Sequence, residues 1–135
     1  MKIVTAALLY NEGKYLLCQR ARSDAQALKW EFPGGKLEQD ETPEQCIVRE
    51  INEELSLDIK VKGHFCDVVY RHATGELLLK AYVVQIISGE MTLNVHQAAL
   101  WVEPEKIIAY DLLPADIEIA ERIVGVKGYE KQNIK

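Results

Sequence analysis

Apolar runs separated by turn residues mark the strand-forming parts of the chain. Lys2–Tyr10 is apolar and β-branched, Asn11–Lys14 has turn composition, and Tyr15–Arg20 is apolar again. This order predicts a β-hairpin. Two further strand-rich segments, Asp58–Tyr70 and Glu76–Ile87, are joined by a short turn and predict a second, longer hairpin.

A helix is predicted to begin after Thr42. Thr42 supplies an N-cap oxygen, Pro43 stands where its missing N–H costs nothing, and Gln45 can close a capping box. Apolar residues then recur at helical spacing and predict a face directed at the core. That face comprises Ile47, Val48, Ile51 and Leu55.

The C-terminal part predicts one short strand and further helix. Ala98–Val102 has strand composition, and Pro104–Ala109 has that of a short helix or turn. Pro114 introduces a predicted helix over Ala115–Val124, and the polar tail from Lys127 onward is expected to be frayed. The apolar face of this helix is predicted to hold Ile117, Ala120, Ile123 and Val124.

Length and composition fit one folded domain over residues 1–135. The chain is 48% apolar, which is enough for a sizeable core, and its elements have an α/β or α+β pattern. A net charge of −5 argues against a nucleic-acid polymer as partner, because surfaces that follow phosphates are basic. A phosphate-bearing ligand would therefore need a metal ion between two negative partners.

The cysteines and the N-terminal segment indicate a reducing compartment. Cys18, Cys46 and Cys66 are odd in number and lack C-x-x-C spacing, so we expect small buried hydrophobes and no disulfide or zinc site. Met1–Val4 leads directly into a strand-like segment and lacks the pattern of a secretory signal, and no apolar run has membrane-spanning length. The expectation is a soluble cytoplasmic protein without a membrane partner.

The predicted helix after Thr42 carries an acidic cluster. Glu50, Glu53 and Glu54 lie on the arc beside its apolar face, where like charges repel by a few tenths of a kcal/mol per pair. A hard divalent cation such as Mg²⁺ or Mn²⁺ would relieve this repulsion, since it prefers carboxylate and water oxygens. Arg49 is placed to orient one carboxylate and to hold Glu41 in the preceding loop. The simpler alternative is a solvated acidic face.

The glycine pair before this helix completes a longer motif. Trp30–Phe32 is expected to end a strand, and Pro33–Gly35 breaks it where a backbone without Cβ can approach a bound group. The whole stretch resembles the Nudix box of Nudix hydrolases, with the spacing G-x5-E-x7-R-E-U-x-E-E-x-G-U, in which U is bulky and apolar. Ser56 departs from the motif at its last glycine. The matching residues are Gly35, Glu41, Arg49, Glu50, Ile51, Glu53, Glu54 and Leu57.

The resemblance implies a fold and a reaction. The Nudix fold is a mixed β-sheet in an α/β/α sandwich, and the reaction is hydrolysis of a nucleoside triphosphate to the monophosphate and pyrophosphate. Arg49 would orient the carboxylates, and Glu50 or Glu53 would take the proton of the attacking water. One or more Mg²⁺ or Mn²⁺ ions would be held by the Gly34 carbonyl, Glu50, Glu53 and Glu54.

Three residues before the box are candidates for substrate contact. In the resemblance, an arginine in the place of Arg20 approaches the phosphates or sugar, the Phe32 position lies beside the nucleobase, and Glu31 contacts the base side. The ordinary alternatives are a strand-end arginine, a surface carboxylate and a core aromatic residue.

The loop Asn94–Gln97 is a second departure from the family pattern. Related sequences often place a glutamate shortly before the glutamine, as a metal ligand or general base, whereas this chain has Val95 and His96. Either the helix carboxylates act alone or His96 takes a share of the base work, for which its ordinary pKa is suitable. The default expectation for a loop histidine is a solvated side chain.

Asp116 is the candidate for base recognition. The order L-L-P-A-D after the H-Q-x-x-L-W strand resembles the MutT-like branch of the family and, within it, the CTP pyrophosphohydrolases, in which this residue reads the nucleobase. An ionised aspartate only accepts hydrogen bonds, so it would favour a base edge rich in donors, on cytosine or guanine. The structural alternative is a carboxylate that stabilises the helix N-terminus.

Several alternatives to a cytidine nucleotide pyrophosphohydrolase stay open. One is an enzyme that removes oxidised purine nucleotides such as 8-oxo-dGTP. Another is a non-catalytic nucleotide sensor, although such proteins usually lose box carboxylates and this chain keeps Glu50, Glu53 and Glu54. A third is an acidic helix that docks a basic partner without Mg²⁺. The expected oligomeric state is a monomer or a homodimer.

Overall fold

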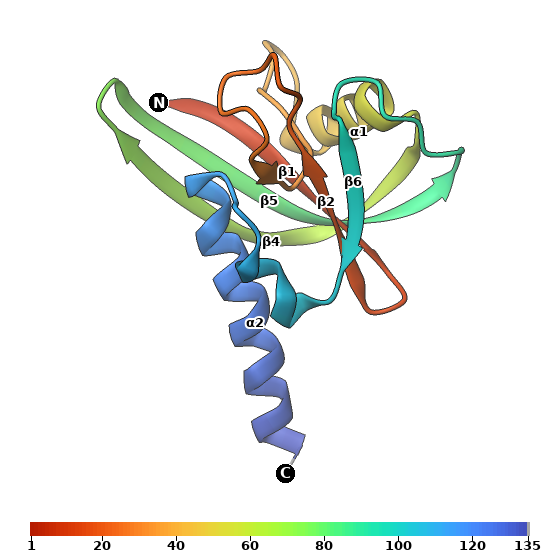
Figure 1. The fold of residues 1–135 in the computed structure, drawn as a ribbon, viewed down its shortest axis with the longest axis vertical. Coiled ribbons are helices and arrows are strands. Elements are labelled where there is room, and N and C mark those ends of the chain that lie inside the picture. The colour runs from red at the N-terminus through yellow and green to blue at the C-terminus, as the bar shows by residue number, and fades with distance from the viewer. Residues whose placement is uncertain (135) are drawn as a thin grey trace.

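One mixed sheet forms the centre of the fold (Figure 1). A computed structural model describes the backbone of residues 1–134 and the side chains of residues 1–125. The strand order is β3-β2-β1-β5-β4, with β6 paired to β2, and β1 runs parallel to β5 while the other pairs are antiparallel. The strands are β1 (Lys2–Asn11), β2 (Lys14–Gln19), β3 (Trp30–Glu31), β4 (Asp58–His72), β5 (Gly75–Ser88) and β6 (Ala98–Val102).

Both predicted hairpins are confirmed. Tyr10 pairs with Tyr15 at the end of the β1–β2 hairpin, and β4 pairs with β5 from Asp58 to His72. Before the turn, β1 pairs with β5 along Lys2–Leu9, and only Tyr10 and Asn11 pair with β2. The strand therefore lies inside the sheet, which explains its nearly continuous apolar sequence.

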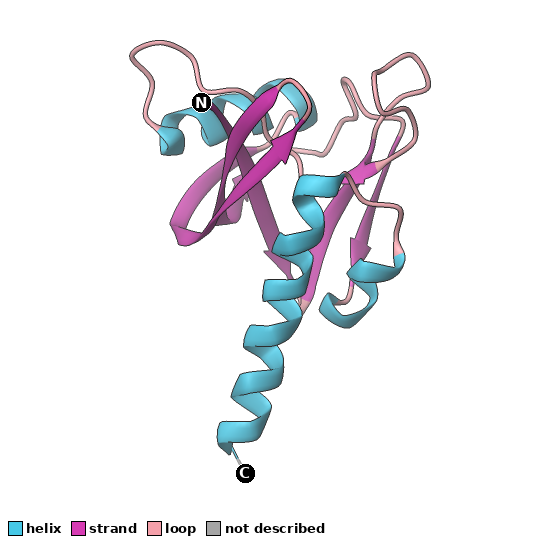
Figure 2. Cartoon of the chain, turned by 90° about the vertical axis from the view of Figure 1, so that its left-hand side faces the viewer, coloured by secondary structure: helices cyan, strands magenta, loops and turns pink. Residues whose placement is uncertain are grey.

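Successive residues of β1 alternate between two hydrophobic cores. Ala6 and Leu8 pack into the core beneath α2 (Pro114–Ile134), whereas Ala7 and Leu9 pack into the core beneath α1 (Pro43–Leu55). Each core is covered by one helix, on opposite faces of the sheet (Figure 2). The mixed sheet between helices confirms the predicted α/β (α+β) class and the α/β/α sandwich.

Helix α1 (Pro43–Leu55) begins as the sequence predicts. Thr42 accepts the N–H of Gln45 at 3.1 Å, and Gln45 accepts the N–H of Thr42 at 3.0 Å, so the capping box is confirmed. The predicted core face is wrong at Val48, which is 40% exposed, while Cys46 is buried in its place. The helix is rotated toward the side that carries Cys46 and Glu50, so that Glu50 and Glu54 are partly buried while Glu53 is exposed.

Helix α2 (Pro114–Ile134) follows the 3₁₀ helix η1 (Pro104–Ala109) and continues past the predicted end at Val124. Its predicted face is wrong at Ile117 and Val124, which are 40% and 37% exposed. The face that packs on the sheet instead comprises Asp116, Ile119, Ala120 and Ile123. Within residues 1–134, no helix is long and apolar enough to cross a membrane. Side chains of the tail predicted to be frayed, from Lys127 onward, lie outside the described residues.

The end of α1 is tied to the loop that leads to β6. Ser56 adopts the left-handed conformation, with φ 57° and ψ 33°, where the family motif has glycine. Asn94 donates its side-chain amide to the Ser56 hydroxyl at 3.0 Å and to the Glu53 carbonyl at 2.9 Å. The backbone N–H groups of Thr92 and Asn94 also donate to α1 carbonyls, at 2.9 and 3.0 Å. The serine hydroxyl therefore joins the helix end to the loop, which a glycine could not do.

Candidate active site

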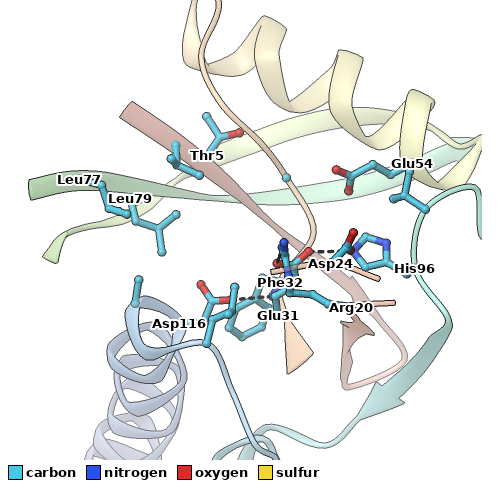
Figure 3. Close-up of a pocket in the computed structure, with 15 residues that line it drawn as sticks. Thr5, Arg20, Asp24, Glu31, Phe32, Glu54, Leu77, Leu79, His96 and Asp116 are labelled. Atoms are coloured by element: carbon cyan, nitrogen blue, oxygen red, sulfur yellow. Dashed lines mark hydrogen bonds and ion pairs between the residues drawn. The ribbon is translucent and has the colours of Figure 1, made fainter. Parts of the chain in front are cut away.

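A cavity of about 360 Å³ lies between α1, the sheet and the start of α2 (Figure 3). Its wall is divided between an apolar part and a polar part. The apolar part includes Val4, Phe32, Leu77, Leu79, Leu113 and Ala115. The polar part includes Thr5, Arg20, Asp24, Glu31, Glu54, His96 and Asp116.

The glycine pair lets the chain pass closely between β1 and α1. A Cβ on Gly34 would lie 2.1 Å from the carbonyl oxygen of Thr5, and one on Gly35 would lie 2.3 Å from Cδ of Glu50. The N–H of Thr5 donates to the Gly35 carbonyl at 2.8 Å, and the Ala7 N–H donates to Pro33 at 2.7 Å. Side chains are therefore excluded at both glycines, at Gly34 by backbone and at Gly35 by the Glu50 carboxylate.

Arg49 holds the edge of the acidic cluster. Its guanidinium contacts both carboxylate oxygens of Glu41, at 2.7 and 3.0 Å, and Oε1 of Glu50 at 2.8 Å. Glu53 is farther away, at 3.4 Å, and its side chain is 58% exposed. The hydrogen bonds from Arg49 lower the pKa of Glu41 to about 2. Glu50 therefore has a fixed orientation, whereas Glu53 lies at the solvent edge.

Glu54 is the carboxylate that turns into the cavity. Its Oε1 is buried and has no hydrogen-bond partner among the described side chains. Burial, followed by the charges of Glu31 and Glu50, raises the pKa of Glu54 to about 9. This carboxyl group therefore lacks a positive partner in its charged form, as expected of a group that completes its coordination with a cation.

The predicted metal ligands are brought together only in part. Gly34 and Glu54 line the cavity and Glu50 is adjacent, but Glu53 points toward Arg49 at the surface. Across residues 1–125, no three His, Cys, Asp or Glu side chains converge closely enough to hold a metal ion. Gathering the set would require a change in the Glu53 rotamer, which is open to that exposed side chain.

Arg20, Glu31 and His96 form a hydrogen-bonded line in the polar wall. Arg20 Nη1 donates to Glu31 Oε1 at 3.0 Å, and His96 Nε2 lies 2.8 Å from Glu31 Oε2. Arg20 also donates Nε–H to the carbonyl of Ala25 at 2.9 Å. The expectation of a solvated loop histidine is wrong, since His96 is only 8% exposed.

Asp116 lies in the wall with its carboxyl group directed at the chain before the glycine pair. The N–H of Phe32 donates to Asp116 Oδ2 at 3.2 Å, so the side chain contacts β3's end and does not cap its own helix. Burial, reinforced by the charge of Glu31, raises the pKa of Asp116 well above its ordinary value. The predicted preference of Asp116 for donor-rich base edges assumed the ionised form, and this burial disfavours that form in the ligand-free protein.

The four predicted substrate-contact residues all lie in the wall of one cavity, but sequence patterns did not indicate much of the rest of that wall. Arg20, Glu31, Phe32 and Asp116 all line it. Thr5, Leu77 and Leu79 were not recognised. Thr5 could have been noticed as a hydroxyl residue within an apolar strand, because a buried hydroxyl needs a hydrogen-bond partner. Its hydroxyl donates to the Gly35 carbonyl at 3.1 Å. The leucines left none, because their composition is that of any core strand.

Comparisons with known proteins define the class. A sequence profile of the NUDIX domain matches residues 1–123. Together with the box residues and the sandwich fold, this match establishes that the chain belongs to the Nudix family, and it is a Nudix hydrolase.

Particular relatives are similar over almost the whole chain. A CTP pyrophosphohydrolase of Escherichia coli is 38% identical over 125 residues, covering 92% of both chains. An 8-oxo-dGTP diphosphatase of the same organism is 30% identical over 121 residues, covering 89% of this chain and 94% of the relative. The solution structure of the E. coli ORF135 protein superposes with a TM-score of 0.85 at 36% identity, covering 94% and 91%. The crystal structure of a MutT protein from Methanosarcina mazei superposes at 0.82 with 25% identity, covering 99% and 96%.

Proposed function

We propose that the protein hydrolyses a nucleoside triphosphate to the monophosphate and pyrophosphate with Mg²⁺ or Mn²⁺, and that a cytidine-type nucleotide is its preferred substrate. One observation carries the proposal: a single cavity joins Glu54, at the acidic end of α1, to the buried Asp116 on α2. A nucleotide has the same two ends, a polyphosphate that requires cations and a base that requires a fixed polar partner.

The acidic end suits a hard divalent cation. The unpaired oxygen of Glu54 and the raised pKa of its carboxyl group are both relieved by a positive charge at that place. Gly34, Glu50, Glu53 and Glu54 would hold the ion. When bound, such an ion neutralises phosphate charge and lowers the pKa of a coordinated water.

The chain's own groups orient this site and receive a proton. Arg49 fixes Glu50 at 2.8 Å, so that one carboxylate is held in place before substrate arrives. Glu53 is exposed and contacts Arg49 only at 3.4 Å, which leaves its carboxylate free to accept the proton of the attacking water. Phe32 and the apolar wall exclude water from the remainder of the cavity.

A protonated Asp116, the form that burial favours, would match cytosine. A neutral carboxylic acid donates one hydrogen bond and accepts another, which matches the N3 acceptor and the amino group of cytosine. Oδ2 can accept the N–H of Phe32 and that amino group together, because it has two lone pairs, while Oδ1 carries the donated proton. The N1 and N2 edge of guanine offers two donors and would instead favour the ionised form.

The relatives named 8-oxo-dGTP diphosphatases keep an oxidised guanine nucleotide as the second candidate. A panel of normal, methylated and oxidised nucleoside triphosphates, assayed with Mg²⁺ for the monophosphate and pyrophosphate, separates the two. Highest kcat/KM on a cytidine nucleotide supports the proposal, and highest kcat/KM on 8-oxo-dGTP replaces it. Nucleotide binding without any pyrophosphate release would indicate a sensor instead of an enzyme.

A further inference from the structure

His96 is buried beside the cavity in an arrangement that the proposed reaction does not explain. It belongs to the loop before β6, its side chain is 4% exposed, and its Nε2 lies 2.8 Å from Oε2 of Glu31. Arg20 donates to the other oxygen of Glu31, so this side chain acts as an acceptor, and we assign the proton of His96 to Nε2. Nδ1 is buried and has no partner among the described residues. With one nitrogen engaged and the other shielded from water, His96 is poorly placed to act as a general base.

Glu31 needs support from outside its own element. It stands on β3, which has only two residues, and it is itself 9% exposed. A buried carboxylate without partners is costly, and a strand this short fixes its rotamer weakly. Arg20 forms a hydrogen bond with Oε1 of Glu31 and His96 forms one with Oε2, so two different parts of the chain fix the carboxylate.

We infer that His96 is a positioning residue for substrate binding: by donating Nε2–H to Glu31 it holds that carboxylate in the cavity wall, where its remaining lone pairs accept hydrogen bonds from a bound nucleoside. This inference rests on the proposed function for the identity of the ligand. Figure 3 places Glu31 between the Glu54 end and the Asp116 end of the cavity, beside Phe32. A carboxylate there meets the nucleoside part of a ligand, not its terminal phosphates, so His96 acts on affinity more than on turnover.

Two amide substitutions separate this role from simple packing. The side chain of His96→Gln reaches far enough to place an N–H near the Nε2 position, whereas the shorter His96→Asn reaches only the Nδ1 position and leaves Glu31 without its donor. His96→Phe retains the ring volume without any donor. We expect His96→Gln to bind CMP within about 3-fold of the wild type, and the other two variants to bind it about 10-fold more weakly.

The chain supplies a matched control. His64 also pairs with a carboxylate through Nε2, at 2.7 Å from Asp67, but this pair is on the surface. His64→Phe should leave CMP affinity unchanged. Thermal unfolding of every variant shows whether it is folded. If His96→Phe does not fold, the comparison of CMP affinity between His96→Gln and His96→Asn still tests the inference.

A double-mutant cycle between His96 and Glu31 tests whether His96 affects CMP binding through Glu31. If His96 acts through Glu31, adding His96→Asn to Glu31→Ala, which has no acceptor, should weaken CMP binding by less than 2-fold beyond Glu31→Ala alone. If the two residues act independently, the two losses of affinity multiply. A long-range ¹H–¹⁵N spectrum of the metal-free protein should show the proton on Nε2 and a shifted Nε2 resonance in Glu31→Gln. The inference is overturned if His96→Gln and His96→Asn bind CMP equally well, or if the losses of CMP affinity from the His96 and Glu31 substitutions multiply. A wild-type protein that binds CMP but releases no pyrophosphate from CTP overturns the proposed function alone.

Discussion

Replacing Asp116 by asparagine should stabilise the ligand-free protein at neutral and alkaline pH. Asp116 is 4% exposed, its Oδ2 accepts the Phe32 N–H at 3.2 Å, and Glu31 and Arg20 are the charged groups that act on it. An asparagine oxygen can accept the same bond and carries no ionisable proton. The substitution therefore removes the titration while keeping the contact.

The magnitude follows from the raised pKa of Asp116. Below its ordinary pKa of 3.8 the carboxyl group is protonated in the folded and the unfolded chain, and the group's contribution to stability is fully present. Above that value the unfolded chain ionises while the folded chain keeps the proton. The wild type then loses up to about 1.4 kcal/mol per pH unit until the folded pKa is passed. In Asp116→Ala, the unpaired Phe32 N–H instead costs about 1–3 kcal/mol at every pH.

Urea unfolding at several pH values from 4 to 9, followed by circular dichroism, measures both effects. The stability of Asp116→Asn relative to the wild type should rise steadily with pH, and that of Asp116→Ala should carry a constant loss in addition. Asp111 provides the control, because its side chain is 72% exposed and Asp111→Asn removes a solvated carboxylate instead of a buried one. A difference between Asp116→Asn and the wild type that does not change with pH would refute the view that Asp116 is held neutral.

Three further predictions concern the acidic helix and the glycine pair. Glu53→Gln should keep wild-type thermal stability but lower kcat with Mg²⁺ by about 10²-fold or more, and unchanged turnover would rule out its role as base. Gly35→Ala should stay folded and lose activity, because the added Cβ displaces the Glu50 carboxylate from the position in which Arg49 holds it. Gly34→Ala should lower the thermal midpoint markedly, because its added Cβ meets backbone. The reverse order in unfolding and activity assays would contradict this. The pKa of Glu41, about 2, means that its stabilising contribution is present above pH 4.5 and lost as pH falls toward 2, so the acid side of the stability curve should be flatter in Glu41→Gln. A thermal midpoint that falls equally with pH in both proteins would disprove it.

Periodicity and capping were sufficient to predict the elements but not the orientation of the helices. In α1 the burial of Cys46 instead of Val48, and in α2 that of Ile119 instead of Ile117, reflect the same cause. Each helix is turned so that acidic residues face the protein, and a search for an apolar stripe treats those residues as solvent-facing. The functional carboxylates are thus the reason that the simple rule fails.

The site was predictable where the motif spacing carried chemistry. Glu50, Glu53 and Arg49 could be placed because their helical spacing brings two like charges beside one arginine. The Glu31–His96 contact joins residues 65 positions apart, and no local pattern indicates such a pair. The raised pKa of Asp116 likewise depends on burial by residues distant in the chain, which a sequence window does not contain.

The hydrogen bonds from Asn94 to Ser56 and Glu53 make one mechanical unit of helix α1 and the segment that contains His96. A serine in the left-handed conformation is strained by about 1–2 kcal/mol relative to glycine. Its hydroxyl, which glycine lacks, accepts the hydrogen bond that holds the neighbouring loop. Any tilt of α1 would therefore move the loop that contains His96 with it, and this loop would not open as an independent flap.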